Sequence, residues 1–419
     1  MKILIRKARI IDPSSPFHNS VQDIFINNGL IEEIGTAITS KADQVIEPEG
    51  LHVSPGWVDV FANFNDPGYE FKETLETGAF AAAAGGFTHV FVIPNTKPAI
   101  DSKSQVEYVK RRSTSLPVNI HPIGAITKNT DGKELAEMYD MHSSGSVAFS
   151  DGLNSIQSSG MLLKALQYVK TFNGVIMQIP DDTTVGTYGL MNEGTVSTRL
   201  GLQGKPAMSE ELMVARDLKL ARYAESKVHF TGISSAKSLE YVHRSKQGGI
   251  EVTASVTPFH LYFTDEDLVD YDTNLKVLPP LRAAKDRNAL LEAIQNDVVD
   301  CIATHHQPHE WDSKTCEFEH ARFGMIGLET CFGVMRSTGI STEKFVQLAT
   351  VNPRRIFGLP PATLKKHETA DLTLFLPDEI YTLEERHIRS KSKNTPFMGK
   401  QLTGRVIGII NADKLFLNH

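Results

Sequence analysis

The densest group of side chains that could do chemistry is the histidine set of the string ATHHQPH, namely His305, His306 and His309. Neutral imidazoles bind zinc and carry protons, so such a group can serve a hydrolytic metal site. His305 and His309 are four residues apart, a spacing that puts two ligands on one face only in a helix. A proline separates them and the string follows an apolar strand, so the pattern favours polar pocket lining or interface contacts over direct metal binding.

Few other candidates accompany these histidines. A hydrolytic metal site needs three or more converging His and carboxylate ligands. Asp151, in the string FSDG, lies where an apolar strand ends, although an aspartate there fits a loop or helix cap equally well. Asn95 ends another such strand. Neither a GxSxG elbow nor a Walker phosphate loop is present in the sequence.

The stretch SPGWVDVFANFNDPG, residues 54–68, has the frame of a site but little chemistry in it. A Pro-Gly turn flanks each side of an apolar strand, and strand ends of this kind are good positions for catalytic side chains. The positions on offer hold Phe61, Asn63 and Asn65.

The elements that must position these residues alternate between apolar, β-branched runs and helical segments. Eight runs followed by helices predict an α/β fold of the (β/α)8 TIM-barrel type, since buried parallel strands are nearly continuous apolar runs. A long Gly- and Thr-rich excursion over residues 182–208 follows the fifth run, and such loops commonly shape a site on the C-terminal face. The runs span residues 57–64, 88–95, 118–126, 146–151, 174–180, 227–234, 249–258 and 297–306.

Both ends of the chain contain short strands broken by turns. Alternation in IFINNGLIEEI predicts a hairpin with its turn at Asn28-Gly29. The two ends therefore predict one small β-sandwich-like domain, with residues 1–53 as its first part and 357–419 as its second. Residues 54–356 form the inserted barrel.

Composition excludes several classes of protein. The chain has 419 residues, a net charge of -7 and a pI of about 6.1, without a long Lys or Arg run, so we expect no nucleic-acid surface. No run reaches the ~18 apolar residues of a membrane helix, and the first residues read as a β-strand and not as a signal peptide. The three cysteines match no zinc or disulfide pattern, which is typical of reduced thiols in a cytoplasmic protein.

Many strings, in order, give the chain a family resemblance along almost its whole length. It resembles the dihydroorotases of the amidohydrolase superfamily, nearer the bacterial form fused or bound to aspartate transcarbamoylase than the hydantoinase branch. The resemblance implies the same barrel and two-ended β-domain. It rests on strings such as DPGYEFKETLETG, AAAAGGFTHVFVIPNTKP, GLMNEG, VTASVTPFHLYFTDEDL, TNLKVLPPLR, DCIATHHQPH, FGMIGLET, VNPRRIFGLP and SKSKNTPFMG.

The resemblance also implies what has been lost. Of six metal and base positions in the family pattern, only the bridging aspartate, Asp151, is kept. The family's zinc-binding histidines fall on Phe61, Asn63, Ile179 and Gly232, and its catalytic aspartate falls on His305. The arginine that holds the substrate carboxylate falls on Asn65.

The substrate positions are mixed by the same comparison. Asn95 and His309 match family substrate contacts, whereas Leu278 replaces the asparagine of the NPPLR string. A pair of histidines after the seventh strand becomes Phe259 and His260.

Three functions are therefore open. The first is a non-catalytic homologue (a pseudoenzyme) without zinc or another cofactor, which acts in pyrimidine biosynthesis as a structural partner of aspartate transcarbamoylase. The second is an active dihydroorotase or related cyclic-amide hydrolase with a metal site remodelled around Asp151, His305, His306 and His309. The third is a binding module that senses a pyrimidine intermediate through Asn95 and His309. The family also implies a homo-oligomer.

Overall fold

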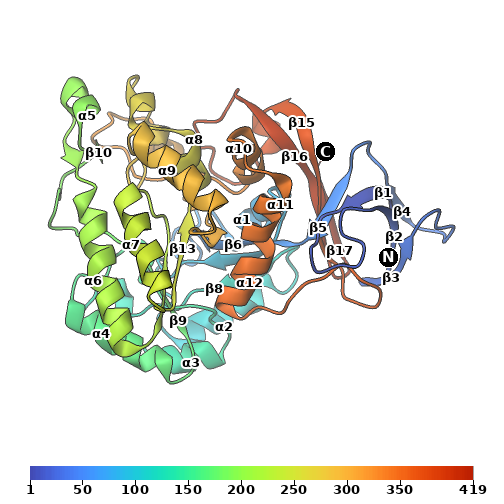
Figure 1. Cartoon of the computed structure of the whole chain (residues 1–419), viewed down its shortest axis with the longest axis horizontal. Helices are drawn as coiled ribbons and strands as arrows, with labels where there is room; N and C mark the ends of the chain where they lie inside the picture. Colours follow the sequence, from blue (N-terminus) through green and yellow to red (C-terminus); the bar gives the residue numbers. More distant parts are fainter. Residues whose placement is uncertain (419) are drawn as a thin grey trace.

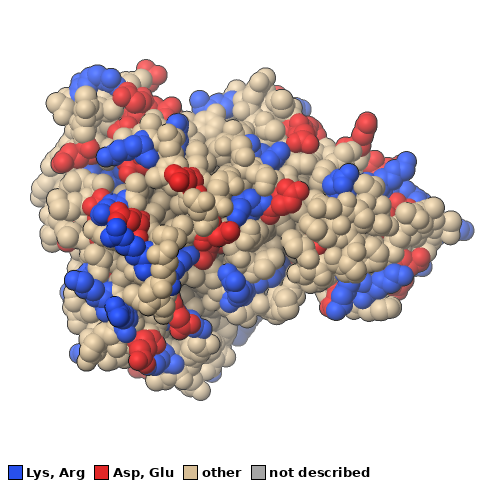
Figure 2. Space-filling view, viewed as in Figure 1, with Lys and Arg blue, Asp and Glu red and all other residues tan. Residues whose placement is uncertain are grey.

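A barrel surrounded by helices and a β-domain that holds both chain ends make up the protein (Figure 1). The computed structural model describes residues 1–418. Within that part of the chain, no helix combines the length and the apolar character needed to cross a bilayer. Acidic and basic side chains alternate over the face shown in Figure 2, without an extended region of one sign there.

The eight predicted runs follow one another around the barrel in chain order. The fourth run, residues 146–151, joins its neighbours only through isolated bridges from Phe149 to Gly124 and to Ile176. The barrel closes where the Asn63 N–H donates to the His306 carbonyl at 2.8 Å. The other strands are β6 (Trp57–Ala62), β7 (Phe87–Val92), β8 (Asn119–Pro122), β9 (Val175–Gln178), β12 (Lys227–Phe230), β13 (Val252–Val256) and β14 (Cys301–Ile302).

A buried carboxylate fastens the first strand to the last. Asp59 Oδ1 accepts the Thr304 backbone N–H at 2.7 Å, and Oδ2 accepts the Thr304 hydroxyl at 2.8 Å. Burial raises the pKa of Asp59 to about 7, although both Thr304 hydrogen bonds act to lower it. Asp59 therefore has a structural role: it joins the first and last strands where the barrel closes.

The helices surround the barrel, and three of them, α1, α4 and α7, begin at a side-chain cap. The Thr74 hydroxyl accepts the Thr77 N–H at 3.1 Å at the start of α1, and Ser158 and Ser235 cap α4 and α7 in the same way. The alanines of α1 are buried, which lets this helix lie close to the strands. The helices are α1 (Leu75–Ala84), α2 (Lys103–Ser113), α3 (Met138–Ser143), α4 (Ser159–Lys170), α6 (Met208–Ala224), α7 (Ala236–Gln247), α8 (Pro258–Tyr262), α9 (Ala284–Gln295), α10 (Cys331–Ser337), α11 (Thr342–Val346) and α12 (Asn352–Phe357).

The excursion over residues 182–208 has small elements of its own. It contains β10 (Met191–Asn192), α5 (Thr195–Leu200) and β11 (Gly204–Lys205), and β10 pairs with β11 in parallel. Asp182 N–H donates to the Ser209 carbonyl at 2.9 Å, which holds the excursion against the start of α6.

Both chain ends meet in one eight-stranded sheet. Its order is β17-β16-β15-β5-β1-β2-β3, with β4 paired to β1. The predicted turn has Asn28 and Gly29 at φ 47° and 82°, as a tight hairpin turn requires. The strands are β1 (Lys2–Ile10), β2 (Val21–Asn27), β3 (Leu30–Gly35), β4 (Gln44–Ile46), β5 (His52–Pro55), β15 (Asp371–Thr382), β16 (Gln401–Asn411) and β17 (Lys414–Leu417).

An aromatic group joins this sheet to the barrel. The buried Trp57 ring of β6 lies 5.4 Å from Phe375 of β15 and 4.7 Å from Phe345 of α11, between ring centroids. Its indole N–H donates to Ser54 Oγ at 2.9 Å, so the polar end of the ring is satisfied. The two parts of the chain thus share a packed junction.

Candidate active site at the mouth of the barrel

The first strand delivers a phenyl ring where the family pattern has a zinc-binding histidine. Phe61 is buried, and its ring centroid lies 4.5 Å from that of His305. It belongs to a continuous apolar group inside the barrel that also contains Ile179, Met177 and Ala303. Positions 61 and 179, where the resemblance implies zinc ligands, are therefore part of the packed interior.

The next two positions of the same strand bond to each other. Asn63 Oδ1 accepts the Asn65 backbone N–H at 3.0 Å, and both residues are buried. Asn65 has a φ of 58°, in the left-handed region that asparagine tolerates better than most residues. Its Nδ2 has no hydrogen-bond partner among the described residues.

Asp151 is where the family pattern places a metal-bridging carboxylate, but its oxygens are occupied. Oδ1 accepts the backbone N–H groups of Ile126 and Thr127, each at 2.9 Å, and Oδ2 accepts the Thr127 hydroxyl. Burial raises its pKa to about 6, against the lowering effect of these hydrogen bonds. Asp151 therefore holds a loop through its hydrogen bonds, which is the alternative role that its sequence context indicated.

The Asn95 amide also bonds to the chain itself. Its Nδ2 donates to the Asp151 carbonyl at 3.0 Å, and its Oδ1 accepts the Leu153 N–H at 2.9 Å. Asn95 therefore holds the turn after the fourth strand, and a substrate contact through the same amide would have to compete with these bonds.

Gly232 and His305 share one space. Gly232 has a φ of 72°, and a Cβ atom there would lie 2.5 Å from His305 Cε1. His305 Nε2 lies 2.8 Å from Thr231 Oγ1, so the imidazole is held across the position that a side chain at 232 would fill. Burial lowers the pKa of His305 to about 3, and the nearby His260 and His229 add to this effect.

His306 and His309 each have a hydrogen-bond partner at one ring nitrogen, while His306 Nε2 has none among the described residues. His306 Nδ1 accepts the Gly327 N–H at 3.2 Å, and its Nε2 lies 3.6 Å from Glu73 Oε2. His309 Nε2 lies 2.8 Å from the Phe323 carbonyl, and burial lowers its pKa to about 4. The ATHHQPH segment is not helical, as its proline predicts, so His305 and His309 do not share a helix face.

The two residues considered after the seventh strand have structural roles, His260 through hydrogen bonds and Phe259 in an apolar cluster. His260 Nδ1 lies 2.7 Å from Thr257 Oγ1 and its Nε2 lies 3.0 Å from the Pro279 carbonyl. Burial lowers the pKa of His260 to about 4. Phe259 is buried with Leu275 and Val277.

A small cavity of about 70 Å³ remains at the mouth, beside the replaced positions Ile179 and Leu278. It is lined by apolar side chains and by four charged groups that motif reasoning missed, namely Asp181, Lys205, Glu210 and Arg282. Lys205 Nζ lies 2.9 Å from Asp181 Oδ1, and the buried Arg282 donates to Ser234, Asn192 and the Lys205 carbonyl at 3.0 to 3.1 Å. Lys205 in QGKP and Arg282 in PPLR are the only sequence signals for this cluster, because its members are far apart in the chain.

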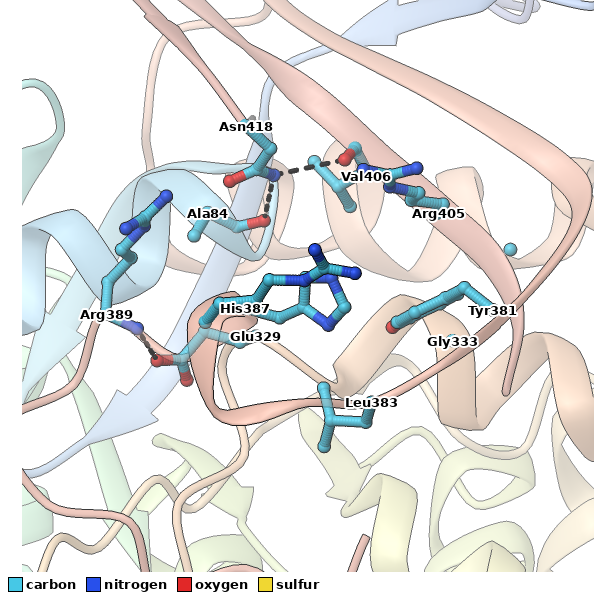
Figure 3. Close-up of a pocket in the computed structure, with 12 residues that line it drawn as sticks. Ala84, Glu329, Gly333, Tyr381, Leu383, His387, Arg389, Arg405, Val406 and Asn418 are labelled. Atoms are coloured by element: carbon cyan, nitrogen blue, oxygen red, sulfur yellow. Dashed lines mark hydrogen bonds between the residues drawn. The ribbon is translucent and has the colours of Figure 1, made fainter. Parts of the chain in front are cut away.

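A second cavity, of about 30 Å³, lies between the barrel and the terminal sheet (Figure 3). Arg386, His387, Arg389 and Arg405 line it, together with Glu329. Glu329 Oε1 accepts the backbone N–H groups of Arg389 and Ser390 at 3.2 and 2.9 Å. None of the site residues predicted from the sequence lines this cavity.

The residues at the mouth do not fit a zinc centre. Zinc in proteins is held by Cys, His, Asp or Glu, and the side chains at 61, 179 and 232 have no donor atom. Asp151 already accepts three hydrogen bonds, and the imidazole of His305 blocks the space at 232. Across residues 1–418, no three His, Cys, Asp or Glu side chains converge in a way that could hold a metal ion.

Comparisons with known proteins agree on one family. Residues 50–238 match the family model described as Dihydro-orotase-like. Proteins named dihydroorotase from Pelotomaculum thermopropionicum and Caldanaerobacter subterraneus are 40% and 41% identical to the chain. The alignments cover 96% and 97% of this chain and 96% and 95% of the relatives.

Solved structures show the same fold at lower identity. An L-hydantoinase from Arthrobacter aurescens has a TM-score of 0.86 at 22% identity, over 99% of this chain and 96% of its own. A dihydropyrimidinase from Brevibacillus agri has a TM-score of 0.84 at 19% identity, over 100% of this chain and 95% of its own. With the barrel fold and the full-length relatives in agreement, the chain belongs to the dihydroorotase family of the amidohydrolase superfamily.

Proposed function

We propose that this chain is a dihydroorotase homologue that does not catalyse the family reaction, and that it acts in the cytoplasm as a structural partner of aspartate transcarbamoylase in pyrimidine biosynthesis. One observation carries the first half of the proposal. The mouth of the barrel is filled by side chains that exclude the family ligand set, with Phe61 packed against His305 and His305 in the space above Gly232.

The chemistry of hydrolysis explains why this filling matters. A zinc ion lowers the pKa of its bound water from ~15.7 to ~7 and so supplies hydroxide at neutral pH. General base help from a side chain is worth only ~10²–10⁴-fold, which does not replace an activated hydroxide. His305 would also have to leave its contact with Thr231 Oγ1 before it could take a proton.

The bond set around the mouth supports the same conclusion. A site that has lost its metal but kept exposed ligands would contain several buried polar groups without partners, which is costly. Here Asp151, Asn95 and His309 all bond to the chain itself, whereas Asn65 Nδ2 and His306 Nε2 are buried without a hydrogen-bond partner among the described residues. Most of the candidate side chains at the mouth therefore serve the fold.

The proposed partner follows from the resemblance to family members that bind aspartate transcarbamoylase. The frame around the lost centre supports a role that depends on shape: the Asp66-Pro67-Gly68 turn, the Asp59–Thr304 closure and the two-ended sheet are all in place. A protein that keeps its fold but has no metal site can still act by binding another protein through its surface.

The first experiment measures metal content and hydrolysis on the same sample. The purified chain, supplemented with zinc or manganese, is assayed with dihydroorotate and with carbamoyl aspartate, and the dihydroorotase of Pelotomaculum thermopropionicum serves as the active control. We expect no stoichiometric metal and no turnover. A normal enzymatic rate would overturn the proposal and would favour a remodelled site around Asp151, His305, His306 and His309.

The second experiment tests the partner. The chain is mixed with the aspartate transcarbamoylase of the same organism and followed by sedimentation and by transcarbamoylase activity. We expect a defined complex and a change in that activity. Without a complex, the structural half of the proposal fails, and calorimetry with dihydroorotate then tests the ligand-sensing alternative.

A further inference from the structure

The second cavity, between the barrel and the terminal sheet, has a mostly basic lining (Figure 3). Arg386 and Arg389 come from the segment that follows β15, and Arg405 comes from β16. Among the described residues, Glu329 is the only acidic side chain in the lining. A cleft lined mainly by one sign of charge concentrates small ions of the opposite sign.

The three arginines keep donors free for a ligand. Within residues 1–418 the Arg389 side chain has neither an ion pair nor a hydrogen bond, and only its backbone N–H donates, at 3.2 Å. Arg405 uses Nη1, which donates to Glu379 Oε1 at 2.8 Å, and Arg386 uses Nε, which lies 2.8 Å from Glu384 Oε2. A guanidinium has five N–H groups, so most of these donors remain available.

Two neutral donors complete the lining. The Tyr381 and His387 rings lie 5.8 Å apart, between centroids, and burial raises the pKa of Tyr381 to about 12, so its hydroxyl keeps its proton. His387 Nδ1 accepts the Glu384 N–H at 3.0 Å, which leaves the ring proton on Nε2. Burial lowers the pKa of His387, and the charges of the three arginines add to this effect. All three guanidinium groups therefore lie near this ring.

Glu329 has one oxygen in use and one without a partner. The residue is only 8% exposed, and its Oε1 accepts the backbone N–H groups of Arg389 and Ser390. Its Oε2 has no hydrogen-bond partner among the described residues. A buried carboxylate oxygen without a donor is costly, and an ion or water molecule is the usual explanation. The lining thus suits a molecule with negative charge for the arginines and a donor group for the carboxylate.

We propose that this cavity binds hydrogen phosphate, with its charged oxygens toward Arg389 and Arg405 and its P–O–H group toward Glu329. Arginine holds phosphate oxygens through paired N–H groups. A water molecule needs a cavity of ~10–15 Å³, so the volume of about 30 Å³ suits a small ion and excludes a large organic molecule. Because the Arg386 and Arg389 side chains are exposed, the ion can enter from solvent.

The carboxylate makes the site selective for an oxyanion that carries a proton. At about pH 8 inorganic phosphate keeps one P–O–H group, whereas sulfate has none. A phosphomonoester has also lost its last proton at this pH, because its second pKa is ~6. Sulfate and the monoester would therefore bring a bare oxygen against Glu329, and the two negative charges would repel each other.

The test is calorimetric titration of the full chain at about pH 8 with sodium phosphate, sodium sulfate and methyl phosphate. Phosphate is expected to bind at least about tenfold more tightly than the other two ions. Glu329→Gln keeps an Oε1 for the two backbone N–H groups and presents an amide donor in place of Oε2. This variant is expected to bind sulfate at least about tenfold more tightly than the unaltered chain does, and to lose the preference for phosphate.

A second variant tests the arginines. Arg389→Ala is expected to weaken phosphate binding about fivefold or more, and because this side chain is exposed it serves even if Glu329→Gln does not fold. Arg222→Ala, at an exposed arginine of α6 on the far side of the barrel from β16 (Figure 1), is the matched control and leaves phosphate binding unchanged.

Several outcomes would overturn the proposal. Equal affinities for phosphate and sulfate, or methyl phosphate that binds as tightly as phosphate, would show that Glu329 does not select the proton. A phosphate affinity that Arg389→Ala leaves unchanged would place the ion elsewhere, and no binding at about 10 mM would leave the cavity to water. Metal content, hydrolysis and the complex with aspartate transcarbamoylase do not enter these measurements, so their failure is separate from that of the proposed function.

Discussion

Gly232 and His305 occupy one volume at the mouth of the barrel: a Cβ atom at 232 would lie 2.5 Å from His305 Cε1. The imidazole is fixed there by its contact with Thr231 Oγ1 at 2.8 Å and by the Phe61 ring. The two departures from the family pattern are therefore coupled, because the histidine at 305 requires the glycine at 232.

This coupling predicts a large cost for Gly232→Ala. The new methyl group would meet the imidazole, and alanine would have to adopt a φ of 72°. Overpacking costs about 1–3 kcal/mol and left-handed backbone about 1–2 kcal/mol, so we expect a loss of about 2–5 kcal/mol in the free energy of unfolding. Urea unfolding measures it.

Gly249 supplies the control for backbone strain alone. Its φ is 76°, and a Cβ there would meet nothing within 4 Å. Gly249→Ala should cost only the backbone part, about 1–2 kcal/mol. In a His305→Ala background, Gly232→Ala should fall to the same cost. Equal costs for both glycines in the unaltered chain would contradict the shared volume.

Much of this fold could be predicted from the sequence because its strands are buried on both sides. The run VFVIP, residues 90–94, is apolar throughout, so β7 and its neighbours stand out between helices. The fourth run, residues 146–151, could be predicted in the same way, yet it forms only isolated bridges. Regular pairing depends on the adjacent strands, which the sequence of the run itself does not specify.

The positions at which the resemblance implies metal ligands could be located for another reason. The frame around Phe61 and Asn63 keeps its turns, so each departure could be located by its neighbours. The contacts that the side chains at the mouth make with the rest of the chain could not be predicted from the sequence. The Asn95 amide bonds to residues 151 and 153, and Lys205 meets Asp181 and Arg282, through contacts between distant parts of the chain that no local pattern encodes.

The buried ring at position 61 gives a second prediction. Phe61→Ala removes a side chain that is 2% exposed and leaves a cavity in the barrel interior. Such changes cost about 3–5 kcal/mol. Phe71→Ala is the matched control, since Phe71 is 56% exposed and its truncation should stay within about 0.5 kcal/mol. A small loss at 61 would mean that the mouth is not packed as described.

His305 gives a pH dependence with a definite sign. Its folded pKa of about 3 lies below the ordinary 6.5, because burial disfavours the charged ring. Between these values the unfolded chain binds a proton that the folded chain does not, so stability is lost as the pH falls from about 6.5 towards 3.

The variant for this test is His305→Asn, which does not titrate and tolerates the φ of 45° at this position. Denaturant unfolding at pH 5, 6 and 7 should show the native chain losing stability relative to the variant by up to about 1.4 kcal/mol per pH unit below 6.5. Parallel curves would show that His305 is not buried in its neutral form.

The last prediction concerns the metal centre itself. Phe61→His, Asn63→His, Ile179→His, Gly232→His and His305→Asp together restore the family ligand set around Asp151. If the backbone frame is intact, zinc affinity should rise at least about a hundredfold, or about 2.7 kcal/mol, measured by competition with a chelating dye.

The matched control is the same variant without His305→Asp. It should gain little, because the imidazole at 305 still blocks the side chain at 232. Turnover of dihydroorotate should need Asn65→Arg as well, since an arginine supplies the two-pronged hydrogen bonds that hold a carboxylate. If the variant with all five substitutions folds but its zinc affinity is unchanged, the strand ends no longer converge on one metal position. The residue changes at 61, 63, 179, 232 and 305 would then accompany a changed backbone at the strand ends.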